Sequence, residues 1–274
     1  MKQSKINNCP IVYYTKRHDT SSQWILFIHS AFVDHHMFDK QIDFFSRKYN
    51  ILSVDILGHG KSVETAKGDT LNKMSFWIKD ILLAENIEKV HIVGISLGTV
   101  LAQDFANKYS HHIASLSCFG GYDINNFDPS LQKANNSAHA SMFIKAIFSM
   151  KAFAKANMKI SAFTPQAQQD FYEMNIHFPK KSFMYLSSIG KIVNTSKTTT
   201  RTYPLFIGCG EHDVAGEHKA IEQWKKSEPN CKVFIFEGAG HCVNMDTPEN
   251  FNKFLDEFIS SIKNLISPKF PCNS

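Results

Sequence analysis

Short, nearly continuous apolar runs alternate along this chain with amphipathic stretches of helical periodicity, and this alternation limits the possible folds more than any other feature. Runs rich in Val, Ile, Leu and Phe are typical of strands that are covered on both faces. The runs are Trp24 to Ile28, Ile51 to Val54, Val90 to Val93, Ile113 to Cys118, Leu205 to Ile207 and Val233 to Phe236. The pattern predicts an α/β protein with a mostly parallel, doubly wound sheet, and Ile11 to Tyr14 is a candidate edge strand.

The alternation stops for a long stretch in the second half of the chain. Residues 122–201 contain no convincing strand but several helical patterns, including two that begin at Pro165 and Pro179. Proline fits the first turn of a helix, where its missing N–H group is not needed. We therefore predict a core formed by residues 1–121 and 202–274, with a helical insertion at 122–201.

Ser96 follows one of the strand patterns directly and precedes a helical pattern that runs from Leu97 to Tyr109. A serine on a sharp turn from strand to helix has its hydroxyl exposed, with the helix N-terminus behind it. Gly94 and Gly98 relieve the steric crowding of such a turn. The G-x-S-x-G pattern alone would arise by chance in about one chain of this length in ten. The alternative is an incidental serine that caps the helix.

Two further residues follow later strand patterns in positions suited to act with this serine. Asp213 lies in the loop after Leu205 to Ile207, and His241 lies in the loop after Val233 to Phe236. The carboxyl ends of parallel strands meet at one edge of a sheet, so these loops should converge on Ser96. We predict that His241 takes the proton of Ser96, while Asp213 orients the imidazole and stabilises its cation. Activity should then rise as His241 loses its proton, near pH ~6.5.

Together with two earlier motifs, these residues resemble the α/β-hydrolase family in its small, lidded form. The earlier motifs are Ile28-His29-Ser30-Ala31 and Asp55-Ile56-Leu57-Gly58-His59-Gly60-Lys61-Ser62, and the whole set spans the chain from Trp24 to Asn250. The resemblance implies the α/β-hydrolase fold and an oxyanion hole formed by the backbone N–H groups of Ala31 and Leu97. It also implies that residues 122–201 form a helical cap over the active site.

The expected cap is rich in Phe, Met and Ile, which favours an uncharged acyl substrate with an apolar part. The candidate pocket residues are Ser30, Phe32, Tyr122, Phe143 and Phe148. Ser30 stands where the family usually has glycine, and it is either a pocket residue or a surface serine. We predict a serine hydrolase that cleaves a small carboxylic ester through an acyl-enzyme. Thioesters, lactones, activated amides and carbon–carbon bonds remain open, because related intermediates serve each.

The alternative function is a small-molecule receptor or signalling protein on the same fold, with slow turnover or none. Composition argues against two classes of partner, nucleic acids and membranes. The net charge of +5 comes from 30 scattered Lys and Arg residues without a dense basic run, so we expect no nucleic-acid partner. No stretch reaches the ~18 apolar residues that span a bilayer, so we expect no stable membrane insertion. The oligomeric state stays open.

The six cysteines form no C-x-x-C pair, and the N-terminus lacks the apolar stretch of a signal peptide, so we expect free thiols in the cytoplasm. No dinucleotide or phosphate-binding motif suggests a cofactor. We also expect no metal. The histidines of the His35-His36 and His111-His112 pairs should point in different directions, which makes them poor chelates. His29 and His59 are explained by hydrogen bonds within turns.

Overall fold

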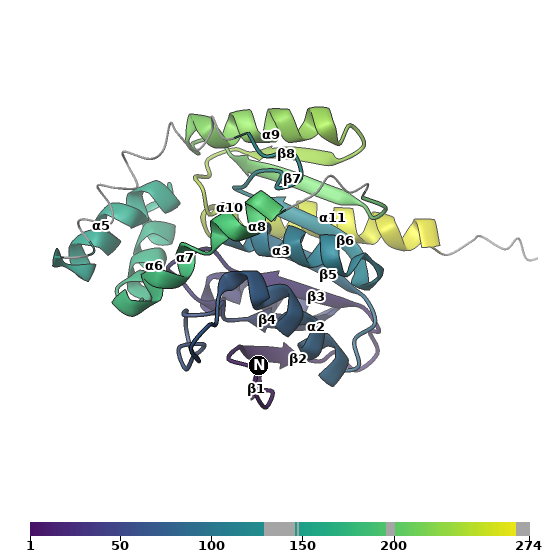
Figure 1. Cartoon of the computed structure of the whole chain (residues 1–274). Coiled ribbons are helices and arrows are strands. Elements are labelled where there is room, and N and C mark those ends of the chain that lie inside the picture. Colours follow the sequence, from purple (N-terminus) through teal and green to yellow (C-terminus); the bar gives the residue numbers. More distant parts are fainter. Residues whose placement is uncertain (129–145, 147, 196–200, 267–274) are drawn as a thin grey trace, which may run out of the picture.

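The computed structural model describes residues 1–128, 146, 148–195 and 201–266, and its centre is an eight-stranded sheet (Figure 1). The strands are β1 (Lys2–Lys5), β2 (Val12–Lys16), β3 (Trp24–Ile28), β4 (Asn50–Val54), β5 (Val90–Ile95), β6 (Ile113–Phe119), β7 (Leu205–Gly210) and β8 (Lys232–Phe236). Their spatial order is β1-β2-β4-β3-β5-β6-β7-β8. The β1·β2 and β2·β4 pairs are antiparallel, and all other neighbouring pairs are parallel.

This sheet confirms the predicted fold class, because each of the six apolar runs forms a strand of its parallel part. The position of β2 differs from the expectation in one respect. β2 is not an edge strand, because β1 pairs with its outer side. The residues of β1 are Lys-Gln-Ser-Lys and are mostly exposed, so no apolar pattern marks this strand in the sequence.

Helices cover both faces of the sheet, which explains why the central strand β3 is apolar on both of its faces. In β3, Trp24, Leu26 and Ile28 pack into one buried cluster, whereas Ile25 and Phe27 pack into another. The first cluster contains residues of α2 (Met74–Ala84), α3 (Leu97–Lys108) and α9 (Ala215–Ser227). The second contains residues of α1 (Asp39–Phe45), α10 (Val243–Asp246) and α11 (Pro248–Ile266). Short 3-10 helices lie at η1 (His35–Phe38), η2 (Leu71–Lys73) and η3 (Ser110–His112).

Residues 122–201 connect β6 to β7 and are called the β6–β7 segment below. Its described elements are α5 (Met150–Ser161), α6 (Pro165–Asn175), η4 (Lys180–Ser182), α7 (Phe183–Leu186) and α8 (Ile189–Thr195). In Figure 1, α5, α6 and α7 stand to one side of the sheet. The helix start predicted at Pro165 is confirmed by α6, whereas the one predicted at Pro179 lies one residue later, at the start of η4. The division of the chain into a core and an inserted cap remains a prediction.

Several contacts attach the β6–β7 segment to the rest of the chain. The backbone N–H of Leu71 donates to the hydroxyl of Ser188 at 2.9 Å. The two ends of the segment are joined by a buried ion pair in which Arg201 Nη2 lies 2.7 Å from Asp123 Oδ1. Arg201 also donates to Gln103 of α3 at 3.0 Å. The two ends of the segment therefore lie together beside α3.

Candidate active site

Ser96 occupies a sharp turn between β5 and α3. Its φ angle of 53° lies in the left-handed region that side chains rarely adopt. A Cβ atom on Gly94 would come within 2.5 Å of the carbonyl oxygen of Gly98, and one on Gly98 would collide with the carbonyl oxygen of Ile28. The two glycines are thus needed for the steric reason that the sequence suggests. The Ser96 N–H donates to Phe119 O at 2.9 Å, which ties the turn to the end of β6.

His241 and Asp213 are paired in the loops that follow β8 and β7. Nδ1 of His241 lies 3.1 Å and 3.0 Å from Oδ1 and Oδ2 of Asp213. An ionised carboxylate only accepts hydrogen bonds, so we assign the proton to Nδ1 in the neutral ring, which leaves Nε2 as the basic nitrogen. Asp213 Oδ1 also accepts the N–H of Val214 at 2.8 Å, and this fixes the carboxylate.

Electrostatics make His241 more basic than an ordinary histidine. Burial lowers its pKa, but the negative charge of Asp213 and the hydrogen bond to it outweigh burial and raise the pKa to about 9. The charge of Glu217 also contributes to this rise. The expected rise of activity near pH ~6.5 assumed an ordinary histidine. With the pKa of His241 at about 9, the rise of activity is instead expected near pH 9.

Gly120 brings the His241 ring to the Ser96 turn. It directly follows Phe119, which accepts the Ser96 N–H, and it has a positive φ of 62°. A Cβ atom on Gly120 would lie 3.1 Å from both Cε1 and Nδ1 of His241. The imidazole therefore lies against the backbone beside the serine turn. Within the described parts of the chain, Ser96 and His241 make no direct hydrogen bond.

The backbone expected to form the oxyanion hole lies beside the same turn. Gly98, at the start of α3, packs against the carbonyl oxygens of Ile28 and His29 at the end of β3, so the loop with Ala31 adjoins the helix N-terminus. Among the residues that the structure describes, neither the Ala31 nor the Leu97 N–H donates a hydrogen bond. Two free donors next to a helix N-terminus can bind an anionic oxygen.

The candidate pocket residues differ widely in their placement. Ser30 is buried with 4% exposure, so it is not a surface serine. The ring of Phe32 packs edge-on against Phe153 of α5 and against Phe178, with centroid distances of 5.0 Å and 5.2 Å. Tyr122 is half-buried at the start of the β6–β7 segment. Phe143 lies outside the described residues.

Phe148 is exposed to solvent and does not line a pocket. Its side chain is 83% exposed, so its ring faces solvent and does not form a wall of a buried site. The sequence could not reveal this, because an aromatic residue in a helical pattern looks the same whether its face turns inward or outward. We therefore leave Phe148 out of the proposed pocket.

The two motif histidines are structural, as expected. His29 is fully buried, donates from Nδ1 to Ser30 O at 2.6 Å and accepts the Ile56 N–H at Nε2 at 2.9 Å. Burial lowers the pKa of His29. His59 bonds to Leu57 O at 3.1 Å, and burial lowers its pKa to about 3. Both rings are therefore neutral and hold the turns around the site in place.

Two carboxylates near the site, those of Glu217 and Asp246, belong to no motif in the sequence. Glu217 lies one turn after Asp213, and its Oε2 is shielded from solvent without a hydrogen-bond partner in the described part of the chain. Burial raises the pKa of Glu217; His241 lowers it, and the charge of Asp213 raises it again. Asp246, five residues after His241, accepts hydrogen bonds from two separate segments. In the sequence, Glu217 is marked only as an acidic residue in the first turn of a helix.

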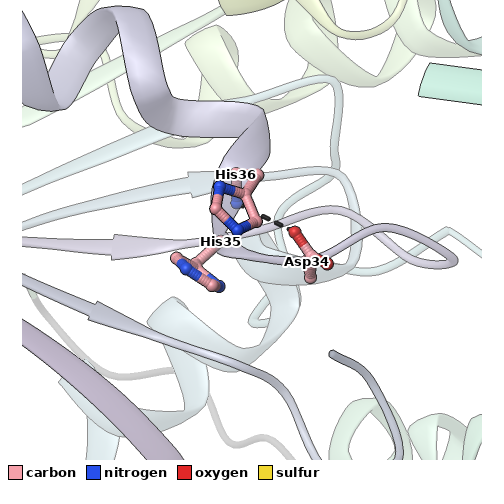
Figure 2. A group of neighbouring side chains, drawn as sticks. All are labelled: Asp34, His35 and His36. Carbon is pink, nitrogen blue, oxygen red and sulfur yellow. Dashed lines mark hydrogen bonds between the residues drawn. The ribbon is translucent and has the colours of Figure 1, made fainter. Parts of the chain in front are cut away.

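Asp34, His35 and His36 form a small cluster of metal-ligand types (Figure 2). The two imidazole rings do not diverge as predicted, since their centroids are 4.1 Å apart. Hydrogen bonds within the protein account for the cluster. Nδ1 of His35 bonds to Asp55 at 2.9 Å, Nδ1 of His36 bonds to Asp39 at 3.0 Å, and Asp34 accepts the His36 N–H at 2.9 Å. The two rings are tilted by 35°, and the Nδ1 atom of each is already bonded to a carboxylate.

The fold and the turn at Ser96 define a known family. Residues 25–254 match the model of the Alpha/beta hydrolase family, so the chain belongs to that family. It is similar to 3-oxoadipate enol-lactonase 1 of Acinetobacter baylyi, with 26% identity over 87% of this chain and 89% of that protein. It is also similar to a Bacillus subtilis protein named as an uncharacterized carboxylesterase, with 20% identity over 86% of this chain and 79% of that one.

A solved structure gives the same result for the fold. A thermophilic esterase from Thermogutta terrifontis matches with a TM-score of 0.78 and 16% identity, over 96% of this chain and 99% of that one. At this identity the likeness concerns the fold alone. In the part of the chain that the structure covers, no helix combines the length and the apolar character needed to cross a bilayer.

Proposed function

We propose that the protein is a serine hydrolase that cleaves small carboxylic esters with Ser96, His241 and Asp213. The observation that carries the proposal is the His241–Asp213 pair, at 3.0 Å, held against Gly120 beside the left-handed Ser96 turn. A nucleophile, a base and a group that orients the base are the three components of this chemistry. The similar lactonase and carboxylesterase support the ester class of substrate.

In the proposed mechanism, Ser96 Oγ attacks the carbonyl carbon while Nε2 of His241 takes the hydroxyl proton. The carbonyl oxygen becomes negative and is held by the N–H groups of Ala31 and Leu97. Collapse of this intermediate breaks the bond to the alkoxide, which takes the proton from His241 and leaves an acyl group on Ser96. Water then attacks the acyl carbon by the same steps, with His241 as its base, and releases the acid.

We further propose that the β6–β7 segment covers this site and selects the acyl group. An aromatic cluster supports this role, because Phe32, next to Ala31, contacts Phe153, Phe178 and Phe183 of the segment. These rings form an apolar wall beside the expected oxyanion hole, which suits an uncharged acyl chain. A cytoplasmic location is supported by five free, buried thiols at Cys9, Cys118, Cys209, Cys231 and Cys242.

The test is a panel of phenyl esters of increasing acyl chain length, together with a small lactone, for the natural chain and for Ser96→Ala. We expect repeated turnover on short acyl chains and a loss of kcat by roughly 10³ or more in the variant. At most one product molecule per protein molecule on every substrate would contradict hydrolysis. That result would favour the receptor function.

A further inference from the structure

Asp246, the last residue of α10, joins two chain segments that are distant in sequence. It is 9% exposed, and its carboxylate accepts the N–H of Phe163 at 3.0 Å, the N–H of Thr164 at 2.7 Å and the Thr164 hydroxyl at 2.9 Å. Its Oδ2 also accepts the N–H of Gly240 at 2.9 Å. One carboxylate therefore binds both the junction between α5 and α6 and the residue directly before His241.

Further contacts tie the same junction to the catalytic loops. The Cys242 N–H, directly after His241, donates to Ser161 O at 2.7 Å. The ring of Phe163 stacks on His212 with a centroid distance of 3.8 Å and an interplanar angle of 15°, next to Asp213. The α5–α6 junction thus contacts the loop of the proposed base on both sides and reaches the loop of the proposed acid.

His241 needs such support because it lies in a loop between β8 and α10. A catalytic group must be held within about 0.5 Å of its productive position, and loops alone hold positions less well than helices or strands. A carboxylate suits the task because it only accepts hydrogen bonds, and its partners here are donors. An amide at this position would turn its NH2 group toward one of those donors.

We infer that Asp246 is a positioning residue for His241, and that it fixes the catalytic loop by bonding it to the α5–α6 junction. The β6–β7 segment is then part of the scaffold that aligns the base, as well as a cover over the site. The inference rests on the proposed function, since it assigns a supporting role to a residue beside the proposed base.

The experiment compares Asp246→Asn with Asp256→Asn. Asp256 is a matched control because its carboxylate accepts bonds from Lys48 and Tyr49 at 2.8 Å and 3.0 Å, on α11 and outside the site. Melting temperature, kcat, KM and the rate of Ser96 labelling by a fluorophosphonate are measured well below melting. We expect Asp246→Asn to lower kcat and the labelling rate at least tenfold with KM within twofold. Asp256→Asn should lower only the melting temperature.

The pH profile gives a readout that a merely structural role would not change. Asp213 and Glu217 are the charged groups that act on His241, so a loosened loop should weaken its pairing with Asp213. The pH at which kcat/KM rises should then move from about 9 toward ~6.5 in Asp246→Asn. A variant with wild-type kcat and an unchanged profile would overturn the inference. Absence of labelling and turnover in the natural chain would instead reject the proposed function.

Thr164 keeps the inference testable if Asp246→Asn does not fold. Thr164→Val removes the hydroxyl donor to Asp246 and keeps the backbone N–H, whereas Thr164→Ser keeps both. We expect Thr164→Val to lower kcat at least twofold at unchanged KM, and Thr164→Ser to match the natural chain. Equal kcat values in all three proteins would overturn the inference.

Discussion

Replacing Asp213 with asparagine should lower the pH at which the enzyme gains activity by about two units or more. Burial alone lowers the pKa of His241, and the charge and hydrogen bond of Asp213 raise it to about 9. Without that charge, the charge of Glu217 still favours the cation, but burial is the largest influence on the pKa and disfavours the cation. We therefore expect the pKa of His241 in the variant to lie at or below its ordinary value of ~6.5.

The size of the effect follows from the fraction of neutral His241. With a pKa of about 9, about one molecule in a hundred has the basic form at pH 7, and about half have it at pH 9. The kcat/KM of the natural chain should therefore rise about fiftyfold between these pH values, since kcat/KM reports the ionisation of the free enzyme. The variant should show no such rise and should be slower by roughly 10⁴, because an amide can hold the other imidazole tautomer.

The assay is kcat/KM on phenyl acetate from pH 6 to pH 10, with the uncatalysed rate subtracted. Glu211→Gln is the control, because Glu211 is an exposed acid two residues before Asp213 and should leave the profile unchanged. A natural chain whose activity rises near pH ~6.5 would refute the electrostatic reasoning. So would an Asp213→Asn variant that keeps the high-pH rise.

Three further changes test the packing around the site. Gly120→Ala places a Cβ atom 3.1 Å from the His241 ring at a positive φ. We expect a loss of about 1–2 kcal/mol in unfolding free energy and at least a tenfold lower kcat. An unchanged kcat would show that the His241 ring does not lie against Gly120. Arg201→Met leaves the buried Asp123 carboxylate without its cationic partner. Urea unfolding should show a loss of about 3–5 kcal/mol in the free energy of unfolding. Unchanged stability would show that the ion pair does not hold the ends of the segment together. Phe178→Ala should shift the preferred acyl chain toward longer esters, and a lower stability with the same chain-length profile would make the aromatic cluster purely structural.

The parallel sheet could be predicted because its physical cause is visible in the sequence. Successive residues of β3, such as Leu26 and Phe27, enter different buried clusters, so both must be apolar. The places of Ser96, Asp213 and His241 followed from the same pattern, since each lies just beyond the carboxyl end of a predicted strand. Gly94 and Gly98 marked the turn because only glycine fits there.

Other features depend on contacts that leave no local pattern. Asp246 bonds to backbone N–H groups at Phe163 and Thr164, more than eighty residues earlier in the chain, and backbone donors are the same for nearly every residue type. The pKa of His241 depends on its burial and its distance to Asp213, neither of which the sequence contains. The exposed position of Phe148 depends on which face of a helical pattern turns outward.

The most direct test of the account is the site of covalent modification by a fluorophosphonate, determined by mass spectrometry of the intact protein and of its peptides. The account predicts a single adduct on Ser96 in the natural chain and none in a folded Ser96→Ala variant. An adduct on another residue, or undiminished labelling of Ser96→Ala, would contradict the assignment of Ser96 as the nucleophile.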